Sequence, residues 1–399
     1  MKSTKRIILL FVIVALACMA GCSSDDDDSL VTPPIDTTTL DTQAKIDAFG
    51  ALGHTDFADR LVIGVENQPN NSITNLNALS GLTSVKGLAI HYNDALEDLN
   101  GLHNLAVIGA DGLVIEENPS LANFAGLFGL GSVGGDAVIE MNGIIESLSG
   151  LDNLVGIGGN LVINENLNLA SLAGLIRLES VGGDVVIGMN RFLESLGGVE
   201  KLVGIGGDLV IKENRSLLQV DGLTRLGSVG GSTVISMNGL IGDLSGLGRL
   251  LSVGGDLSIV ENPRLESIAG LGSLESVGGA AIIKKNEILE SLYGLYRLES
   301  IGGDLGIIEN PSLRKIDGLS GLWTLGGTVV VQLNGLIKDL SGLKNLTSVD
   351  GGLIFLDNPN LANFCGLRQL VIRGFNGTYA AVRNAKNPTL AEIKAGSCS

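Results

Sequence analysis

Side chains that could carry out acid–base or metal chemistry are few in this sequence. The 399-residue chain has three histidines, His54, His91 and His103, all near its N-terminal end. None has a cysteine or second histidine at the spacing that zinc sites use, so we expect no metal. Nucleophile-elbow and phosphate-loop patterns are also absent, so we expect no enzyme activity and no cofactor.

Carboxylates instead recur in a column, 48 residues apart, each directly before an asparagine. Alternate coils of a strand-based array lie about 9.6 Å apart, too far for two carboxylates to share a metal or act as a retaining glycosidase pair. The distance roughly matches the separation of the two carboxylates in inverting glycosidases, but its repetition along the array argues against a single active site. A solvated face, ligand contact and catalysis all stay open, and the column is our candidate binding face: Glu117, Glu165, Glu213, Glu261, Glu309 and Asp357.

A second acidic column follows a Gly-Gly pair in many coils. The calcium-binding nonapeptide repeat needs another glycine between that pair and the aspartate, which this sequence lacks. We therefore expect these side chains to satisfy backbone groups of the turn, although calcium is the alternative. The residues are Asp136, Asp184, Asp208, Asp256 and Asp304.

The asparagines define the repeat that positions these columns. They recur every 24 residues, and Asn93 and Asn67 extend the series upstream with spacings of 25 and 26, which makes thirteen coils. An inward asparagine in each coil would satisfy backbone groups at the bend after the strand and form a ladder along the axis. The expected ladder is Asn93, Asn118, Asn142, Asn166, Asn190, Asn214, Asn238, Asn262, Asn286, Asn310, Asn334 and Asn358.

Each coil repeats one register of apolar and glycine positions. Leu209 and Ile211 alternate as inward residues of a strand, and later leucines recur every three residues, which favours extended or 3₁₀ segments over α-helices. A glycine stands eight residues after each asparagine, from Gly101 to Gly366, and indicates positive φ or close backbone approach. One such unit cannot bury its own apolar face, so the coils must stack.

The outer face of the expected sheet carries an apolar column, exemplified by Val186, Val210 and Val330. Two positions further along each strand, the residue varies from coil to coil. An uncovered apolar stripe beside variable positions is typical of a recognition surface, and variability is also what an unconstrained surface allows.

The pattern Leu-x-Ile-x-x-Asn-x-x-Leu, with Gly-Leu and Ser-Val-Gly-Gly, resembles leucine-rich repeats and is most similar to the receptor L domain. The resemblance covers roughly residues 60–375. It implies an α/β, strand-dominated, right-handed parallel solenoid that binds ligands. Receptor L domains are shorter, come in pairs and flank Cys-rich modules, so their hormone-like ligands do not carry over.

The N-terminus has the features of an export signal. A basic start, a 14-residue apolar run and Met19-Ala20-Gly21-Cys22 resemble a bacterial lipoprotein signal, with Cys22 as the lipidated residue. A soluble secreted protein is the alternative. We expect a signal peptide at 1–22 and an acidic, Thr/Pro-containing tether at 23–40, whose four-aspartate run is similar to signals that direct lipoproteins to the cell surface.

Caps are expected at both ends of the solenoid. Residues 41–60 would form the N-terminal cap, with a short helix over 41–52 that has Asp41 as its N-cap. The solenoid would span 61–375, and 376–399 would close the other end. Cys365 and Cys398 remain after export as an even pair in an oxidising compartment, so we expect a disulfide.

The formal net charge of −17 disfavours nucleic acid and anionic membrane surfaces as partners. We therefore expect an envelope-anchored, lipid-attached module on the outer membrane or cell surface that recognises protein or glycan through its sheet face. A structural or self-associating spacer, and a polysaccharide-active β-helix enzyme, are the alternatives.

Overall fold

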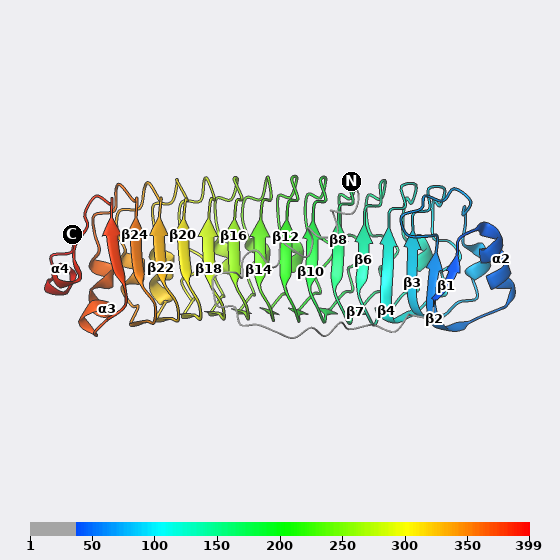
Figure 1. Ribbon diagram of the computed structural model, residues 1–399, viewed down its shortest axis with the longest axis horizontal. Coiled ribbons are helices and arrows are strands. Elements are labelled where there is room, and N and C mark those ends of the chain that lie inside the picture. Colours follow the sequence, from blue (N-terminus) through cyan, green and yellow to red (C-terminus); the bar gives the residue numbers. More distant parts are fainter. Residues whose placement is uncertain (1–36) are drawn as a thin grey trace, which may run out of the picture. The chain divides into compact units, whose positions relative to one another are not determined.

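The computed structural model describes residues 37–399, which form one solenoid of stacked coils (Figure 1). The expected signal peptide, the lipidated Cys22 and residues 23–36 of the expected tether lie outside the described residues. The prediction of a strand-dominated parallel solenoid is confirmed, because every strand pairing within the array is parallel.

A main sheet runs the length of the solenoid. Thirteen of its strands, β2 to β4 and the even-numbered strands β6 to β24, correspond to the thirteen coils, and β1 and β25 add one strand at each end. The strands are β1 (Thr37–Leu40), β2 (Asp56–Ile63), β3 (Ser84–His91), β4 (Val107–Glu116), β6 (Ala137–Glu140), β8 (Leu161–Asn164), β10 (Val185–Gly188), β12 (Leu209–Lys212), β14 (Thr233–Ser236), β16 (Leu257–Val260), β18 (Ala281–Lys284), β20 (Leu305–Ile308), β22 (Val329–Gln332), β24 (Leu353–Leu356) and β25 (Tyr379–Val382).

A row of two-residue strands precedes the main sheet in each later coil. The long strand β4 pairs with both rows, and beyond it a Gly-Gly bend separates the two. The short strands are β5 (Ser132–Val133), β7 (Gly156–Ile157), β9 (Ser180–Val181), β11 (Gly204–Ile205), β13 (Ser228–Val229), β15 (Ser252–Val253), β17 (Ser276–Val277), β19 (Ser300–Ile301), β21 (Thr324–Leu325) and β23 (Ser348–Val349).

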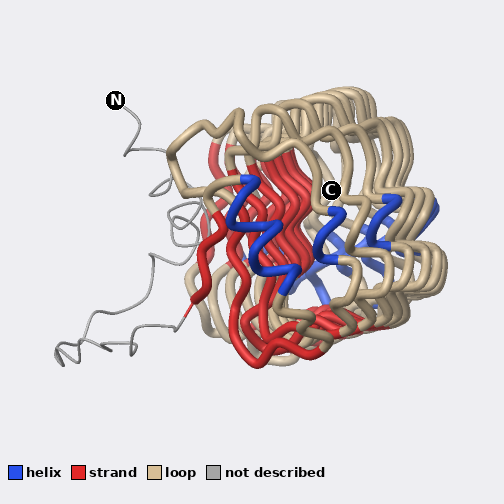
Figure 2. The backbone as a smooth tube through the Cα atoms, turned by 90° about the vertical axis from the view of Figure 1, so that its right-hand side faces the viewer, coloured by secondary structure: helices blue, strands red, loops and turns tan. Residues whose placement is uncertain are grey.

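The rest of each coil is turn and 3₁₀ structure, as the three-residue leucine spacing predicted. Viewed end-on, successive strands superpose and the loops occupy the remaining sides (Figure 2). The 3₁₀ segments are η1 (Asn77–Leu79), η2 (Ala125–Leu127), η3 (Asp221–Leu223), η4 (Ser245–Leu247), η5 (Ala269–Leu271), η6 (Asp317–Gly321), η7 (Ser341–Leu343) and η8 (Cys365–Leu367).

Strand register follows the sequence period directly. Val185 pairs with Leu209, and Leu209 pairs with Thr233, each 24 residues further along the chain. Identical register keeps each inward column in the core, so that Leu209 and Ile211 are both fully buried. One continuous hydrophobic core results, shared by all the coils.

The glycine eight residues after each asparagine mainly allows neighbouring coils to approach each other closely. A Cβ added at Gly246 would lie 1.8 Å from the carbonyl oxygen of Val220, in the preceding coil, and Gly246 has no positive φ. Positive φ at this position occurs only at Gly101, Gly150, Gly174 and Gly198. Coil spacing, rather than local backbone conformation, therefore requires the glycine.

The N-terminal cap differs from the expectation in two respects. Residues 37–40, assigned to the tether, form β1, which pairs with Arg60–Ile63 of β2. The cap helix α2 (Gln43–Ala51) has Thr42 and not Asp41 as its N-cap, because the Thr42 hydroxyl accepts the Lys45 N–H at 3.3 Å. Asp41 forms an ion pair with the Lys45 ammonium instead. Ile46 and Phe49 are buried against the first coil.

The C-terminal end contains a further strand as well as a cap. Strand β25 pairs with β24, although residues 376–399 were expected only to close the array. Helices α3 (Arg368–Ile372) and α4 (Leu390–Ala395) cover this end (Figure 1). A Cys365–Cys398 disulfide joins the last 3₁₀ segment to the chain after α4.

Tyr379, the first residue of β25, makes the stability of this end of the array depend on alkaline pH. Its hydroxyl donates to the Pro388 carbonyl at 2.7 Å, and burial, aided by Glu392, raises the pKa of Tyr379 to about 12. An unfolded tyrosine titrates near pH 10, so the folded state favours the neutral phenol. The resulting stabilisation is complete below about pH 10 and is lost as pH rises through about 12.

Tyr379→Phe is expected to lower the free energy of unfolding by about 1 kcal/mol near neutral pH, because one hydrogen bond is lost. It should also remove the part of the alkaline destabilisation that Tyr379 contributes. Urea unfolding near pH 8 and near pH 11 would test both effects. Tyr293→Phe, at a tyrosine that is 63% exposed, is the control. Identical alkaline behaviour of the two variants would contradict the assignment.

Candidate functional site

The structure places the twelve expected ladder asparagines in one buried column. Asn166 is typical: its Nδ2 donates to the Ile139 carbonyl of the preceding coil at 2.8 Å. Its backbone N–H donates to Oδ1 of Asn190, in the following coil, at 3.1 Å. Each asparagine therefore joins its own coil to both neighbours, which is a structural role, and its burial keeps the side-chain amide away from any ligand.

The ends of the ladder differ from the sequence interpretation. Asn67 is exposed and has a φ of 61°, so assigning it to the series was wrong. The irregular 26-residue spacing had moved it one step out of register. Asn93 is the first member, and its Nδ2 donates to the Ile63 carbonyl. At the other end Asn384 extends the column by accepting the backbone N–H of Asn358 at 3.1 Å.

The candidate binding column of carboxylates occupies a special backbone position. Every residue directly before a ladder asparagine is left-handed, with φ of 53° at Glu117 and 58° at Asp357. The same holds for the alternate coils, for example Met189 and Leu333. The left-handed residue turns the chain inward toward the asparagine, and its N–H bonds to the next coil, as Glu165 N–H does to the Gly188 carbonyl at 3.1 Å. The sequence carried no signal for this conformation, because no glycine occupies the position.

The left-handed conformation is strained for residues other than glycine, and Leu333 is a suitable position to measure that strain. Leu333 is 45% exposed and has a φ of 57°. A left-handed non-glycine residue costs about 1–2 kcal/mol, whereas glycine adds about 0.5–1 kcal/mol of unfolded-state entropy. Leu333→Gly is therefore expected to raise the free energy of unfolding by about 0.5–1 kcal/mol. Leu218→Gly, at a similarly exposed position without positive φ, should lower it instead. Chemical denaturation of both variants checks the sign, and two losses of similar size would refute the strain argument.

Charges in this column are partly neutralised within it. Lys285 donates to Glu261 at 3.0 Å, and this hydrogen bond raises the pKa of Lys285. At the end of the column Arg383 donates from Nη2 to Asp357 at 2.7 Å and lowers the pKa of that carboxyl. These exposed pairs leave no concentrated negative site in the C-terminal half, so the arrangement does not resemble paired catalytic carboxylates.

The Gly-Gly-Asp column forms a second ladder, on the short-strand side. The Asp184 carboxylate accepts the backbone N–H of Asp208 at 2.7 Å, and Asp208 accepts that of Ser232 at 2.6 Å. These carboxylates satisfy turn backbones in the neighbouring coil. Among residues 37–399 no group of three or more His, Cys, Asp or Glu side chains could hold a metal ion.

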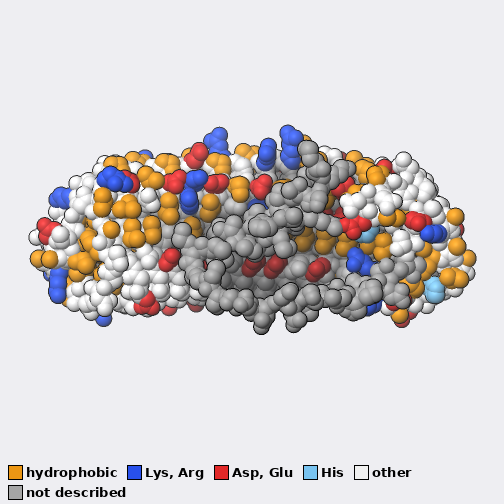
Figure 3. All heavy atoms as spheres, viewed as in Figure 1, with side chains coloured by type: hydrophobic (Ala, Val, Ile, Leu, Met, Phe, Trp, Pro, Cys, Tyr) orange, Lys and Arg blue, Asp and Glu red, His pale blue; other side chains and the backbone are white. Residues whose placement is uncertain are grey.

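The outer face of the main sheet remains as a surface that no helix or loop of the described chain covers (Figure 1). Hydrophobic side chains gather on it over β18–β24 (Figure 3). We call this set the apolar patch; its members are partly exposed. They are Ile282, Ile308, Val330, Ile354 and Leu356. Lys284 and Glu309 lie beside it, 3.8 Å apart at their charged atoms.

A basic column on the loop side was not identified from the sequence. Arg177, Lys201, Arg225 and Arg249 occupy the same repeat position in four consecutive coils, and all four side chains are exposed. Successive coils are about 4.8 Å apart, so the charges form a short positive row on an acidic protein. Comparing charge column by column across the repeats would have found it.

Comparisons with known proteins add little to this geometry. Within residues 37–399 no helix is long and apolar enough to cross a membrane. Neither a family model nor a curated protein sequence matches the chain. An internalin from Listeria monocytogenes, known from its crystal structure, aligns with a TM-score of 0.40 and 18% identity over 86% of this chain and 83% of that chain. A likeness of this degree carries no argument about function, so the functional proposals depend on the surfaces of this chain.

Proposed function

We propose that this protein is an envelope-anchored binding module that recognises a protein partner through the outer face of its main sheet. The observation that carries the proposal is the apolar patch on a sheet face that the described chain leaves uncovered. Half-buried aliphatic residues on a rigid sheet lose little conformational entropy on binding, and contiguous exposed apolar surface usually marks an interaction site. Charged residues at its edge, such as Lys284 and Glu309, supply the polar rim that such interfaces have.

The anchoring half of the proposal comes from the N-terminal sequence. Cys22 would carry the lipid, and residues 23–36 would separate the solenoid from the membrane. Cys22→Ala is expected to release the chain from the membrane fraction. Protease treatment of intact cells followed by mass spectrometry tests surface exposure: solenoid peptides should be released from wild-type cells. Their protection until the cells are broken would contradict display at the surface.

Site-specific photo-crosslinking tests the binding face. A photoreactive residue at Val330, in the apolar patch, should form a covalent adduct with a second protein when intact cells are irradiated. The same residue at Asn168, exposed in the turn after β8 and outside the sheet face, is the control and should form none. Equal adducts at both positions, or none at Val330, would refute a sheet-face site.

Self-association was the alternative expected from the sequence. The end helices α2 and α4 cover both ends of the array, which disfavours end-to-end stacking as its mode (Figure 1). Adducts at Val330 that contain two copies of this chain would favour that alternative over a different partner.

A further inference from the structure

An exposed aromatic cluster interrupts the repeat in two neighbouring coils. The chain has one tryptophan and four tyrosines. Trp323, Tyr293 and Tyr296 are 51%, 63% and 43% exposed. The two tyrosine rings stack with centroids 5.5 Å apart and planes inclined by 28°. Three of the five tyrosine and tryptophan residues of the chain thus lie in two adjacent coils, and each exposes a ring to solvent.

The repeat itself does not require these rings. At the position of Tyr293 the neighbouring coils carry Ala269 and Asp317, and at the position of Tyr296 they carry Gly272 and Ser320. A Cβ added at Gly272 would lie 3.2 Å from the Tyr296 hydroxyl, so this tyrosine extends over the preceding coil. Core packing does not explain exposed rings that both neighbouring coils lack, whereas ligand contact does.

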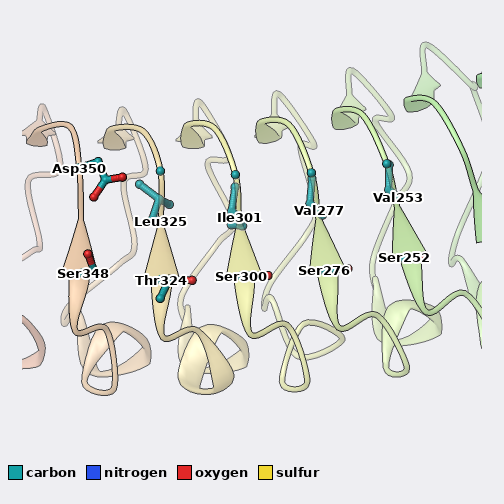
Figure 4. A pocket seen from close by; sticks show the side chains of 14 residues that line it. Ser252, Val253, Ser276, Val277, Ser300, Ile301, Thr324, Leu325, Ser348 and Asp350 are labelled. Atoms are coloured by element: carbon teal, nitrogen blue, oxygen red, sulfur yellow. The ribbon is translucent and has the colours of Figure 1, made fainter.

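A shallow hollow of about 570 Å³ lies over the short strands β15–β23, and its lining residue Thr324 directly follows Trp323 in the sequence. Figure 4 shows the row of hydroxyl-bearing residues along these strands, one from each coil. Successive coils place them about 4.8 Å apart. Glycines and the apolar ends of the strands form the floor. The polar side chains that line it are Ser252, Ser276, Ser300, Thr324, Ser348 and Asp350.

Aromatic and acidic residues border the hydroxyl row. Trp323 directly precedes Thr324, and Glu299 directly precedes Ser300, so the two occupy the same repeat position in adjacent coils. Their backbones are joined by a hydrogen bond from the Trp323 N–H to the Glu299 carbonyl at 2.9 Å. Both residues are exposed. The surface therefore combines ring faces, carboxylates and evenly spaced hydroxyls.

We propose that this surface, formed by Tyr293, Tyr296, Trp323, Glu299 and the hydroxyl row, binds a linear neutral glycan. Aromatic faces stack on the C–H faces of pyranose rings, while hydroxyls and carboxylates exchange hydrogen bonds with sugar hydroxyls. Two coils advance about 9.6 Å, close to the length of a disaccharide, so one sugar ring falls on each coil.

The charge and shape of the hollow select the ligand class. Asp350 in the hollow and Glu299 at its border outnumber the exposed Arg297 beside them, so this surface has no excess positive charge that would favour an acidic polymer. The hollow is shallow and combines hydroxyls and glycines with the aliphatic ends of the short strands, whereas a protein partner needs a deep, desolvated pocket for its anchor residues. This site lies on the short-strand side, away from the apolar patch, and the inference does not rest on the function proposed above.

Trp323 allows a direct test because it is the only tryptophan. The full-length chain, in a detergent without a sugar headgroup, is titrated with hexasaccharides of β-1,4-linked glucose, mannose and N-acetylglucosamine. At least one should change the tryptophan emission saturably. Tyr296→Ala should weaken that binding roughly tenfold, the effect of one lost stacking contact. By calorimetry, Trp323→Phe should retain binding and Trp323→Ala should lose it.

Phe128→Ala is the matched control, because Phe128 occupies the repeat position of Tyr296 in a distant coil and is 54% exposed. It should leave the affinity unchanged. Val330→Asp, in the apolar patch, should also leave it unchanged, so failure here and failure of the proposed sheet-face site are distinguishable. The proposal is overturned if none of the three sugars binds, if Tyr296→Ala and Phe128→Ala behave alike, or if a galacturonate hexamer binds more tightly than all three.

Discussion

Asn238→Ala is expected to lower the free energy of unfolding by about 4 kcal/mol, a large effect for one polar side chain. Asn238 is fully buried in the middle of the ladder. Its Oδ1 accepts the backbone N–H of Asn214 at 3.2 Å, and its Nδ2 donates to the Ile211 carbonyl at 2.9 Å. Alanine leaves both backbone groups buried without partners, and each such group costs about 1–3 kcal/mol.

Asn168→Ala is the matched control for this prediction. Asn168 is exposed and donates one hydrogen bond, to the Gly143 carbonyl at 2.7 Å. Because water replaces that partner, the expected loss is below about 1 kcal/mol. Urea unfolding measures both losses, and amide exchange should show the extra opening of Asn238→Ala concentrated in β12–β16. Equal losses in the two variants would show that the ladder does not hold the coils together.

Gly246→Ala is expected to destabilise the array by about 3 kcal/mol or more, although it adds a single methyl group. Its Cβ would lie 1.8 Å from the Val220 carbonyl oxygen and 2.4 Å from the carbonyl carbon. No side-chain rotamer can relieve a clash with backbone, so two coils must move apart. In a stacked array that movement also disturbs the pairing of their strands.

Gly242→Ala provides the comparison four residues away. A Cβ there meets nothing within 4 Å, and Gly242 has no positive φ. Its effect should stay within about 0.5 kcal/mol. Thermal unfolding of the pair, with m-values from denaturant as a check on cooperativity, separates the clash from a general cost of losing glycine. Comparable melting temperatures would contradict close approach as the reason for this glycine.

A strict repeat also makes departures from it informative. Columns that hold one residue type through the array, such as the asparagines, explain stacking and say little about function. Tyr293, Tyr296 and Trp323 are exposed and differ from the residues at the same positions of the neighbouring coils, so packing does not account for them. The basic column from Arg177 to Arg249 departs from the acidic composition of the chain in the same way.

Periodicity in the sequence was sufficient to predict the coil period, the inward leucine and isoleucine columns and the parallel strand register. These follow from periodicity alone, because a 24-residue unit buries its apolar face only when identical units stack in phase. The 24-residue period does not predict the register where the spacing is irregular, which is why Asn67 was wrongly assigned to the ladder and Asn384 was missed. The N-cap at Thr42 and the strand β1 belong to the ends, where no repeated neighbour constrains the interpretation.

The left-handed backbone at Glu117 and its equivalents, and the reason for the glycine in each coil, could not be predicted from one repeat. Both depend on distances between coils, which a single repeat does not encode: the left-handed residue is held by a bond to the next coil, and the glycine is required by the carbonyl of the preceding one. The contact between Tyr293 and Tyr296 also depends on the tertiary structure, because both side chains are exposed and hydrophobic periodicity predicts only the buried positions.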